Sequence, residues 1–255
     1  MPAIATPLIA ACCLLLTAPA LIMGEDAVSS RPAGEPQAET VILLHGLARS
    51  ARSMRRMQES LTAAGYRVCN LDYPTTEKNV RDLSDDHLAP LIARCQFANP
   101  AKIHFVAHSL GNIVLRQYFK DHPLPNAGRL VMLGPPNQGS EVVDKLGDFA
   151  LFDWINGPAG QQLGTGTNAL PASLPPPPLE TGVIAGSHSI NWILSSLIPG
   201  PDDGKVSLTN AQFTGMQDFI IVPVSHPFLM RDRETIRLTL HFLRHGRFTD
   251  AKDAD

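Results

Sequence analysis

The fold of this chain is decided by the stretch Ala107-His108-Ser109-Leu110-Gly111. A run with β-strand character, 102–106, precedes this stretch, and a helical run, 113–119, follows it. A serine between small residues at such a strand-to-helix corner is typical of a nucleophile elbow, which leaves the serine Oγ exposed at the top of a sheet. Small side chains are needed two positions either side of the serine, because the sharp turn brings the backbone close to the neighbouring chain. Ala107 replaces the usual glycine and is still small, so we take Ser109 as the candidate nucleophile.

The rest of the chain alternates strand-like and helix-like segments, which indicates parallel βαβ units with right-handed crossovers. The expected strands are 41–44, 66–71, 102–106, 129–133, 182–185 and 218–224, and the expected helices are 51–64, 80–97, 113–119 and 231–245. This pattern predicts an α/β fold with a mostly parallel central sheet flanked by helices. We place one domain at 40–248, followed by a short tail at 249–255, since single α/β domains often reach this size.

Composition and net charge exclude some classes of function. The chain has 255 residues, of which 44% are hydrophobic and 18% charged, so it can bury one sizeable core. Its formal net charge of −3 provides no basic footprint for nucleic acid, and we expect no nucleic-acid partner. The oligomeric state is left open.

The first 23 residues are almost wholly apolar, and no lysine or arginine precedes Arg31. An apolar run at 8–16 followed by Ala18-Pro19-Ala20 favours a cleaved signal peptide. Residues 1–23 are also long enough for an uncleaved membrane anchor, and Cys12 leaves a lipoprotein as a third alternative. Residues 24–39 are polar and contain proline and glycine, which is typical of a tether. Each alternative predicts export to the cell envelope or beyond, with membrane association through the N-terminus if the segment is retained.

Beyond the leader the chain has two cysteines, Cys69 and Cys95. Export permits a disulfide. However, Cys69 falls in an expected strand and Cys95 near the end of the following helix, so two separate thiols are the favoured interpretation and a bridge is the alternative.

A serine hydroxyl needs a histidine to accept its proton and a carboxylate to orient that histidine. Of nine histidines, His226 lies directly after the last expected strand and before the closing helix, where a base would reach the carboxyl edge of the sheet. His188 is its rival. Asp202 and Asp203 precede His226 in a loop, and Asp218 is a further candidate for the acid. A plain Asp-Asp-Gly turn is the structural alternative for this loop.

Stabilising the oxyanion requires backbone donors close to the serine. Leu110 provides one N–H, because it directly follows the nucleophile. His45-Gly46-Leu47 follows the first strong strand, and its glycine would let the backbone approach a substrate. The N–H of Leu47 is therefore the second expected donor.

Several stretches together resemble the α/β-hydrolase superfamily, of the bacterial lipase/esterase type. They are 43–47, 70–74, 105–112, Leu133-Gly134-Pro135-Pro136-Asn137-Gln138-Gly139-Ser140, Asp203-Gly204-Lys205-Val206 and Ser225-His226. Lipase-like sequences often contain Asp-Gly-x-Val, with the aspartate before the glycine orienting the histidine, and the resemblance therefore selects Asp203. It implies hydrolysis of carboxylic esters, small or lipid, through an acyl-serine, without a cofactor. Some lipases of this type hold a structural calcium, but no ligands for it map onto this chain, so no metal is predicted. The alternatives are an acyltransferase with the same triad and an inactive envelope protein that binds a ligand.

The long segment 140–180 lies between two expected strands. In enzymes of this type such an insertion would form a cap over the acyl pocket. Phe149, Phe152 and Trp154 lie within six residues of one another, and we expect them to line that pocket or its cap. The alternative is an accessory helix followed by the rigid spacer Pro175–Pro178.

Overall fold

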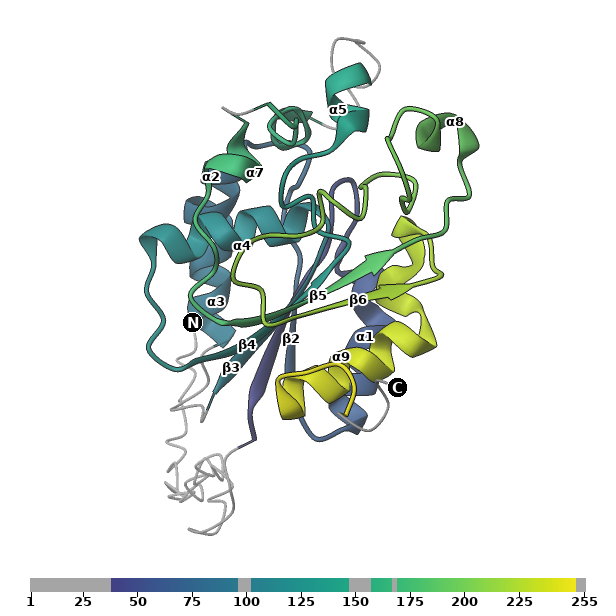
Figure 1. Cartoon of the computed structure of the whole chain (residues 1–255). Helices are drawn as coiled ribbons and strands as arrows, with labels where there is room; N and C mark the ends of the chain where they lie inside the picture. The colour runs from purple at the N-terminus through teal and green to yellow at the C-terminus, as the bar shows by residue number, and fades with distance from the viewer. Residues whose placement is uncertain (1–37, 96–101, 147–156, 167–168, 251–255) are drawn as a thin grey trace, which may run out of the picture. The chain divides into compact units, whose positions relative to one another are not determined.

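A computed structural model describes residues 38–95, 102–146, 157–166 and 169–250, which belong to one compact unit. Its centre is a six-stranded sheet with the order β2-β1-β3-β4-β5-β6, and every neighbouring pair is parallel (Figure 1). The strands are β1 (Thr40–Leu44), β2 (Arg67–Leu71), β3 (Ile103–His108), β4 (Ala127–Leu133), β5 (Glu180–Gly186) and β6 (Asp218–Val222). This is the predicted α/β fold, and each expected strand is present.

Helices cover both faces of the sheet. On one face, α1 (Arg55–Ala63) and α9 (Arg233–His245) pack together, and on the other lie α2 (Val80–Asp82), α3 (Ala89–Cys95) and α4 (Leu110–Asp121) (Figure 1). All residues of β1 and β3 are buried, because these central strands are covered on both sides. The carboxyl ends of these parallel strands meet at one edge, where ligands bind in open α/β sheets.

The expected helix 80–97 is less regular than its sequence suggests. Between α2 and α3 the chain forms a π-helical stretch, η2 (Leu83–Leu88), in which the N–H of Ala89 donates to the carbonyl of Ser84. Pro90 follows directly and has no N–H to continue the α-helical ladder. A local widening of the helix accommodates that missing donor.

Cys69 of β2 and Cys95 at the end of α3 form a disulfide, with 6.1 Å between their Cα atoms. The favoured interpretation of two separate thiols is therefore corrected. It failed because adjacent β2 and α3 converge in space, although a strand and a helix end are 26 residues apart in sequence.

The insertion contributes short helices above the sheet. They are α5 (Glu141–Leu146), a helical turn at 157–161 and α7 (Leu170–Ser173) (Figure 1). Arg116 of α4 ties this segment down, since its buried guanidinium donates to the carbonyls of Asn137, Leu174 and Pro175. Phe149, Phe152 and Trp154 lie outside the described residues.

The remaining elements connect or extend these layers. Residues Ala51–Met54 form the 3-10 turn η1, His226–Arg231 form η3, and Trp192–Ser195 form α8. Within the part of the chain that the structure describes, no helix has the length and apolarity to cross a membrane.

Candidate active site

Ser109 occupies the corner between β3 and α4. Its backbone has φ 53° and ψ −123°, a strained conformation for a residue with a side chain. A Cβ at Gly111 would lie 2.8 Å from the carbonyl oxygen of His45, so only glycine fits at that position. The small residues of the elbow thus permit a turn that holds the Ser109 side chain at the carboxyl edge of the sheet.

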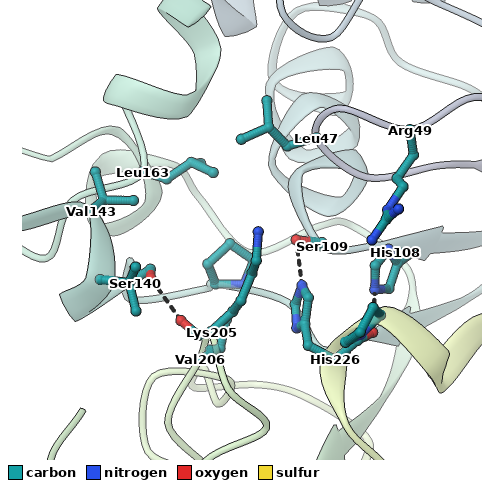
Figure 2. Close-up of a pocket in the computed structure, with 13 residues that line it drawn as sticks. Leu47, Arg49, His108, Ser109, Ser140, Val143, Leu163, Lys205, Val206 and His226 are labelled. Atoms are coloured by element: carbon teal, nitrogen blue, oxygen red, sulfur yellow. Dashed lines mark hydrogen bonds between the residues drawn. The ribbon is translucent and has the colours of Figure 1, made fainter. Parts of the chain in front are cut away.

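The structure brings Ser109, His226 and Asp203 together in a buried chain of hydrogen bonds. His226 Nε2 is 2.9 Å from Ser109 Oγ, and His226 Nδ1 is 2.7 Å from Asp203 Oδ2 (Figure 2). His226 is 3% exposed and Asp203 is 2% exposed. Because a carboxylate only accepts, His226 Nδ1 carries the proton in this arrangement, which leaves Nε2 free to accept the serine proton.

Asp203 is held by the backbone of its own loop. Its Oδ1 accepts from the N–H groups of Lys205 and Val206, at 3.0 and 2.9 Å. These bonds leave Oδ2 directed at His226. The loop 202–206 is thus both a turn and a support for the carboxylate.

The competing candidates lie elsewhere. Asp202 accepts from the hydroxyl of Ser195 and the N–H of Gly204. Asp218 accepts from the N–H of Phe248. His188 is exposed and lines a different groove from the one at Ser109.

The loop after β1 lies beside the nucleophile. A Cβ at Gly46 would come within 3.0 Å of the Ser109 Cβ, and Leu47 lines the same cavity as Ser109. Leu110 is the first residue of α4, and the amides of a first helical turn have no partner inside the helix. Both expected oxyanion donors thus lie next to Ser109.

Tyr73 holds this loop in place. Its hydroxyl donates to the carbonyl of His45 at 2.5 Å, and its ring stacks on the His45 ring with 4.4 Å between centroids. Burial raises the pKa of Tyr73 far above its ordinary value, so the hydroxyl remains a donor. The next residue but one, Thr75, accepts from the N–H of Ala48, which has a positive φ of 52°.

His108 fills the space behind the triad. Its Nε2 donates to the carbonyl of His226 at 3.0 Å, and no hydrogen-bond partner for Nδ1 is found among the described residues. Burial, followed by the proximity of His226, holds the pKa of His108 well below its ordinary value. His108 is therefore neutral and fixes the backbone of His226 rather than competing for the serine proton.

Ser109 opens on a cavity of about 70 Å³ with mostly apolar walls. Val143 of α5 and Leu163 form one side (Figure 2), and Val142 of α5 also lines the cavity. Two cationic side chains also line the cavity. Lys205 lies over it, and Arg49 lies beside His108 (Figure 2).

Lys205 is exposed as a residue, but its ammonium end lies against the pocket. Loss of hydration there, followed by the nearby Arg49 guanidinium, lowers the pKa of Lys205, and the carboxylate of Asp203 partly offsets this. The site therefore combines an apolar wall with positive charge.

The structural supports of the site were missed by the sequence analysis. Three of these supports, Tyr73, Thr75 and Arg116, contact backbone atoms far along the chain. The fourth, Asn112, donates to the nearby carbonyl of Ser109. Only Tyr73 carried a signal, because it belongs to the stretch 70–74 that resembles lipases. In the described ranges, no cluster of three or more His, Cys, Asp or Glu side chains could hold a metal ion.

Comparison with known proteins agrees with the fold. The mature form of a Bacillus licheniformis lipase, BlEst2, superposes with a TM-score of 0.67 at 18% identity, covering 82% of this chain and 93% of that one. Aspergillus fumigatus lipase B gives a TM-score of 0.59 at 16% identity, over 82% of this chain and 53% of the other. The metagenomic carboxyl esterase MGS0156 gives 0.54 at 16% identity, over 80% and 70%. No curated protein sequence shows significant similarity to the chain. The match to the alpha/beta hydrolase family covers residues 41–236, which is most of the chain, from β1 into α9. The protein therefore belongs to that family.

Proposed function

We propose that the protein is a serine hydrolase that cleaves carboxylic esters through an acyl-serine intermediate. The observation that carries the proposal is the unbroken chain from Ser109 Oγ through the His226 ring to Asp203, with bonds of 2.9 and 2.7 Å at the mouth of an apolar cavity. Lipases and an esterase among the structural neighbours support an ester as the substrate.

In the first half-reaction, Ser109 Oγ attacks the ester carbonyl carbon while His226 Nε2 takes the hydroxyl proton. The tetrahedral intermediate then collapses, the carbon–oxygen bond to the alcohol breaks, and Nε2 returns the proton to the departing alkoxide. In the second half-reaction, water attacks the acyl-serine by the same route, releasing the acid and restoring Ser109.

Asp203 and the backbone donors lower the barrier electrostatically. Asp203 keeps the proton on His226 Nδ1 and stabilises the imidazolium that forms. The N–H groups of Leu47 and Leu110 are the proposed donors to the oxyanion, and a donor of this kind contributes about 3–4 kcal/mol to transition-state stabilisation.

Export from the cytoplasm is the second part of the proposal. It rests on the apolar leader at 1–23 and on the Cys69–Cys95 disulfide, since disulfides persist in oxidising compartments. N-terminal sequencing of the protein from cell-envelope and external fractions tests it, and full-length protein recovered from the cytosol with free thiols would contradict it.

The test of the activity is pre-steady-state hydrolysis of p-nitrophenyl butyrate. We expect a burst of p-nitrophenol and, after acid quenching, a butyryl adduct on Ser109 by mass spectrometry. Ser109→Ala and His226→Ala should each abolish the adduct, and the double variant should lose little more than either alone, because the triad acts as a unit. Multiplicative losses in the double variant would contradict the assigned partnership.

A further inference from the structure

A second, more open groove adjoins the cavity at Ser109. It has a volume of about 720 Å³ and shares two lining residues, Arg49 and Pro227, with that cavity. Its charged lining residues are all arginines, namely Arg49, Arg52, Arg55, Arg56 and Arg231. We refer to the surface formed by 48–56 and 227–231 as the arginine groove.

The arginine groove opens at the catalytic edge of the sheet. One wall is the loop after β1 with the start of α1, and the other is η3, which begins at His226. His226, which is hydrogen-bonded to Ser109, is thus also the first residue of the element that forms this wall of the groove. A ligand spanning both spaces would place one part against Ser109 and another among the arginines.

Nearby carboxylates are engaged by other groups. Asp72 accepts from the N–H of Ala51 and lies 3.2 Å from His45 Nε2. Asp232 accepts from the N–H of Thr235 and caps α9. Neither carboxylate lines the arginine groove.

Several guanidinium groups keep their charge available. Arg55 lies 3.5 Å from Glu59, an exposed pair worth little in water. No ion pair of Arg49 or Arg52 with another described residue is found, and both side chains are exposed. A guanidinium is always charged and matches phosphate or carboxylate oxygens with paired donors.

The two ends of the site differ in character. Leu163 and Val143 lie on one side of Ser109, and Arg49 lies on the other (Figure 2). The apolar side matches the chemistry of an acyl chain. With the acyl chain there, the alcohol part of an ester would extend past Arg49 into the arginine groove.

We propose that the arginine groove binds an anionic group on the alcohol part of the ester, so that the enzyme selects amphiphilic esters with an apolar acyl chain and a negatively charged head. This inference names the substrate class of the proposed hydrolase and therefore rests on the proposed function.

The test compares 1-hexanoylglycerol with 1-hexanoylglycerol 3-phosphate, both as monomers in solution. The two esters share the acyl chain and the scissile bond and differ only in the phosphate. We expect a kcat/KM at least about tenfold higher for the phosphate ester, mainly through KM, since hydrogen bonds to charged groups contribute this much. Raising the salt from about 0.05 M to about 0.5 M should reduce the preference, because exposed charges are screened.

Three variants locate the effect. Arg49→Gln combined with Arg52→Gln should lower the ratio of the two kcat/KM values at least about fivefold, while the melting temperature stays that of the wild type. Lysine at both positions should restore part of the ratio. Arg81→Gln is the matched control, since Arg81 is an exposed helical arginine outside the groove, and should leave the ratio unchanged.

Binding to Ser109→Ala, measured by calorimetry with the uncleaved esters, separates this inference from the proposed function. Tighter binding of the phosphate ester to this variant supports the inference even if the wild type cleaves neither ester, in which case the proposed function fails. Equal kcat/KM for both esters with normal turnover overturns the inference and leaves the proposed function standing. A preference that appears only on phosphatidylglycerol vesicles also overturns it, in favour of docking to a lipid surface.

Discussion

Asp203 and His226 are joined twice, once through their side chains and once through their backbones. His226 Nδ1 lies 2.7 Å from Asp203 Oδ2, and the backbone N–H of His226 donates to the Asp203 carbonyl at 2.9 Å. The backbone bond fixes the two loops against each other. The side-chain bond can then select one tautomer of the imidazole without having to position it.

This double connection predicts that Asp203→Asn folds normally but loses activity. The backbone bond is kept, while the amide favours the wrong imidazole tautomer, so kcat should fall on the order of 10⁴-fold. Asp202→Asn is the neighbouring control, because Asp202 contacts Ser195 and Gly204 rather than the histidine. Steady-state kinetics with circular dichroism on both variants checks this, and the reverse order of the two effects would move the acid to Asp202.

Gly46→Ala should impair catalysis through a collision with the nucleophile. A Cβ at this position would lie 2.8 Å from His108 Nδ1 and 3.0 Å from Ser109 Cβ, so the His108 ring must move and Ser109 must give by a few tenths of an ångström. Displacing a reacting group by about 1 Å can cost about 100-fold in rate, and we expect at least a tenfold fall in kcat/KM.

Gly65→Ala is the matched glycine control. Gly65 has a φ of 96° and nothing within 4 Å of an added Cβ. The substitution should cost about 1–2 kcal/mol of stability through the left-handed backbone without changing kcat/KM. Equal catalytic losses in the two glycine variants would refute a specific approach of Gly46 to the site.

Acid should destabilise the fold through buried histidines. Burial lowers the pKa of His45, His104 and His108, so below about pH 6.5 the unfolded chain binds more protons than the folded chain. The free energy of unfolding should therefore fall as pH drops below about 6.5, by up to about 1.4 kcal/mol per pH unit for each histidine.

Denaturant unfolding between pH 4.5 and pH 8 measures this slope, since those limits lie about 2 units below and about 1.5 units above an ordinary histidine pKa. His108→Gln keeps a donor toward the His226 carbonyl and removes the titrating ring, so its slope should be shallower than that of the wild type. His188→Gln, at an exposed position, is the control. A His108→Gln slope as steep as that of the wild type would contradict the assignment.

The sequence predicts those parts of the fold that depend on local patterns. β1 and β3 are continuous apolar runs, as strands covered on both faces require, and the small residues around Ser109 identify the elbow. His226 follows from its place after the last strand.

The remaining features depend on contacts that no local pattern records. The Tyr73 hydroxyl reaches the His45 carbonyl across 28 residues, and Arg116 reaches Leu174 across 58. The disulfide was missed for the same reason. The π-helical stretch η2 before Pro90 could be predicted only in part, since proline predicts an irregularity in a helix but not which form it takes.

The Cys69–Cys95 disulfide should stabilise the domain by about 3–4 kcal/mol, the value expected from the entropy of closing a loop of this length in the unfolded chain. Urea unfolding with and without dithiothreitol measures the difference. Cys69→Ala combined with Cys95→Ala should match the reduced wild type and be insensitive to reductant. Titration of free thiols at these positions in unreduced, exported protein would contradict the pairing.

Labelling with a fluorophosphonate tests the central claim most directly, because the probe reacts only with a serine activated by a neighbouring base. We expect one adduct per wild-type molecule, mapped by mass spectrometry to Ser109, and its loss in His226→Ala, which retains the serine and lacks the base. A wild-type protein that remains unlabelled, or that is labelled at another residue, would contradict an activated Ser109 and with it the proposed hydrolase.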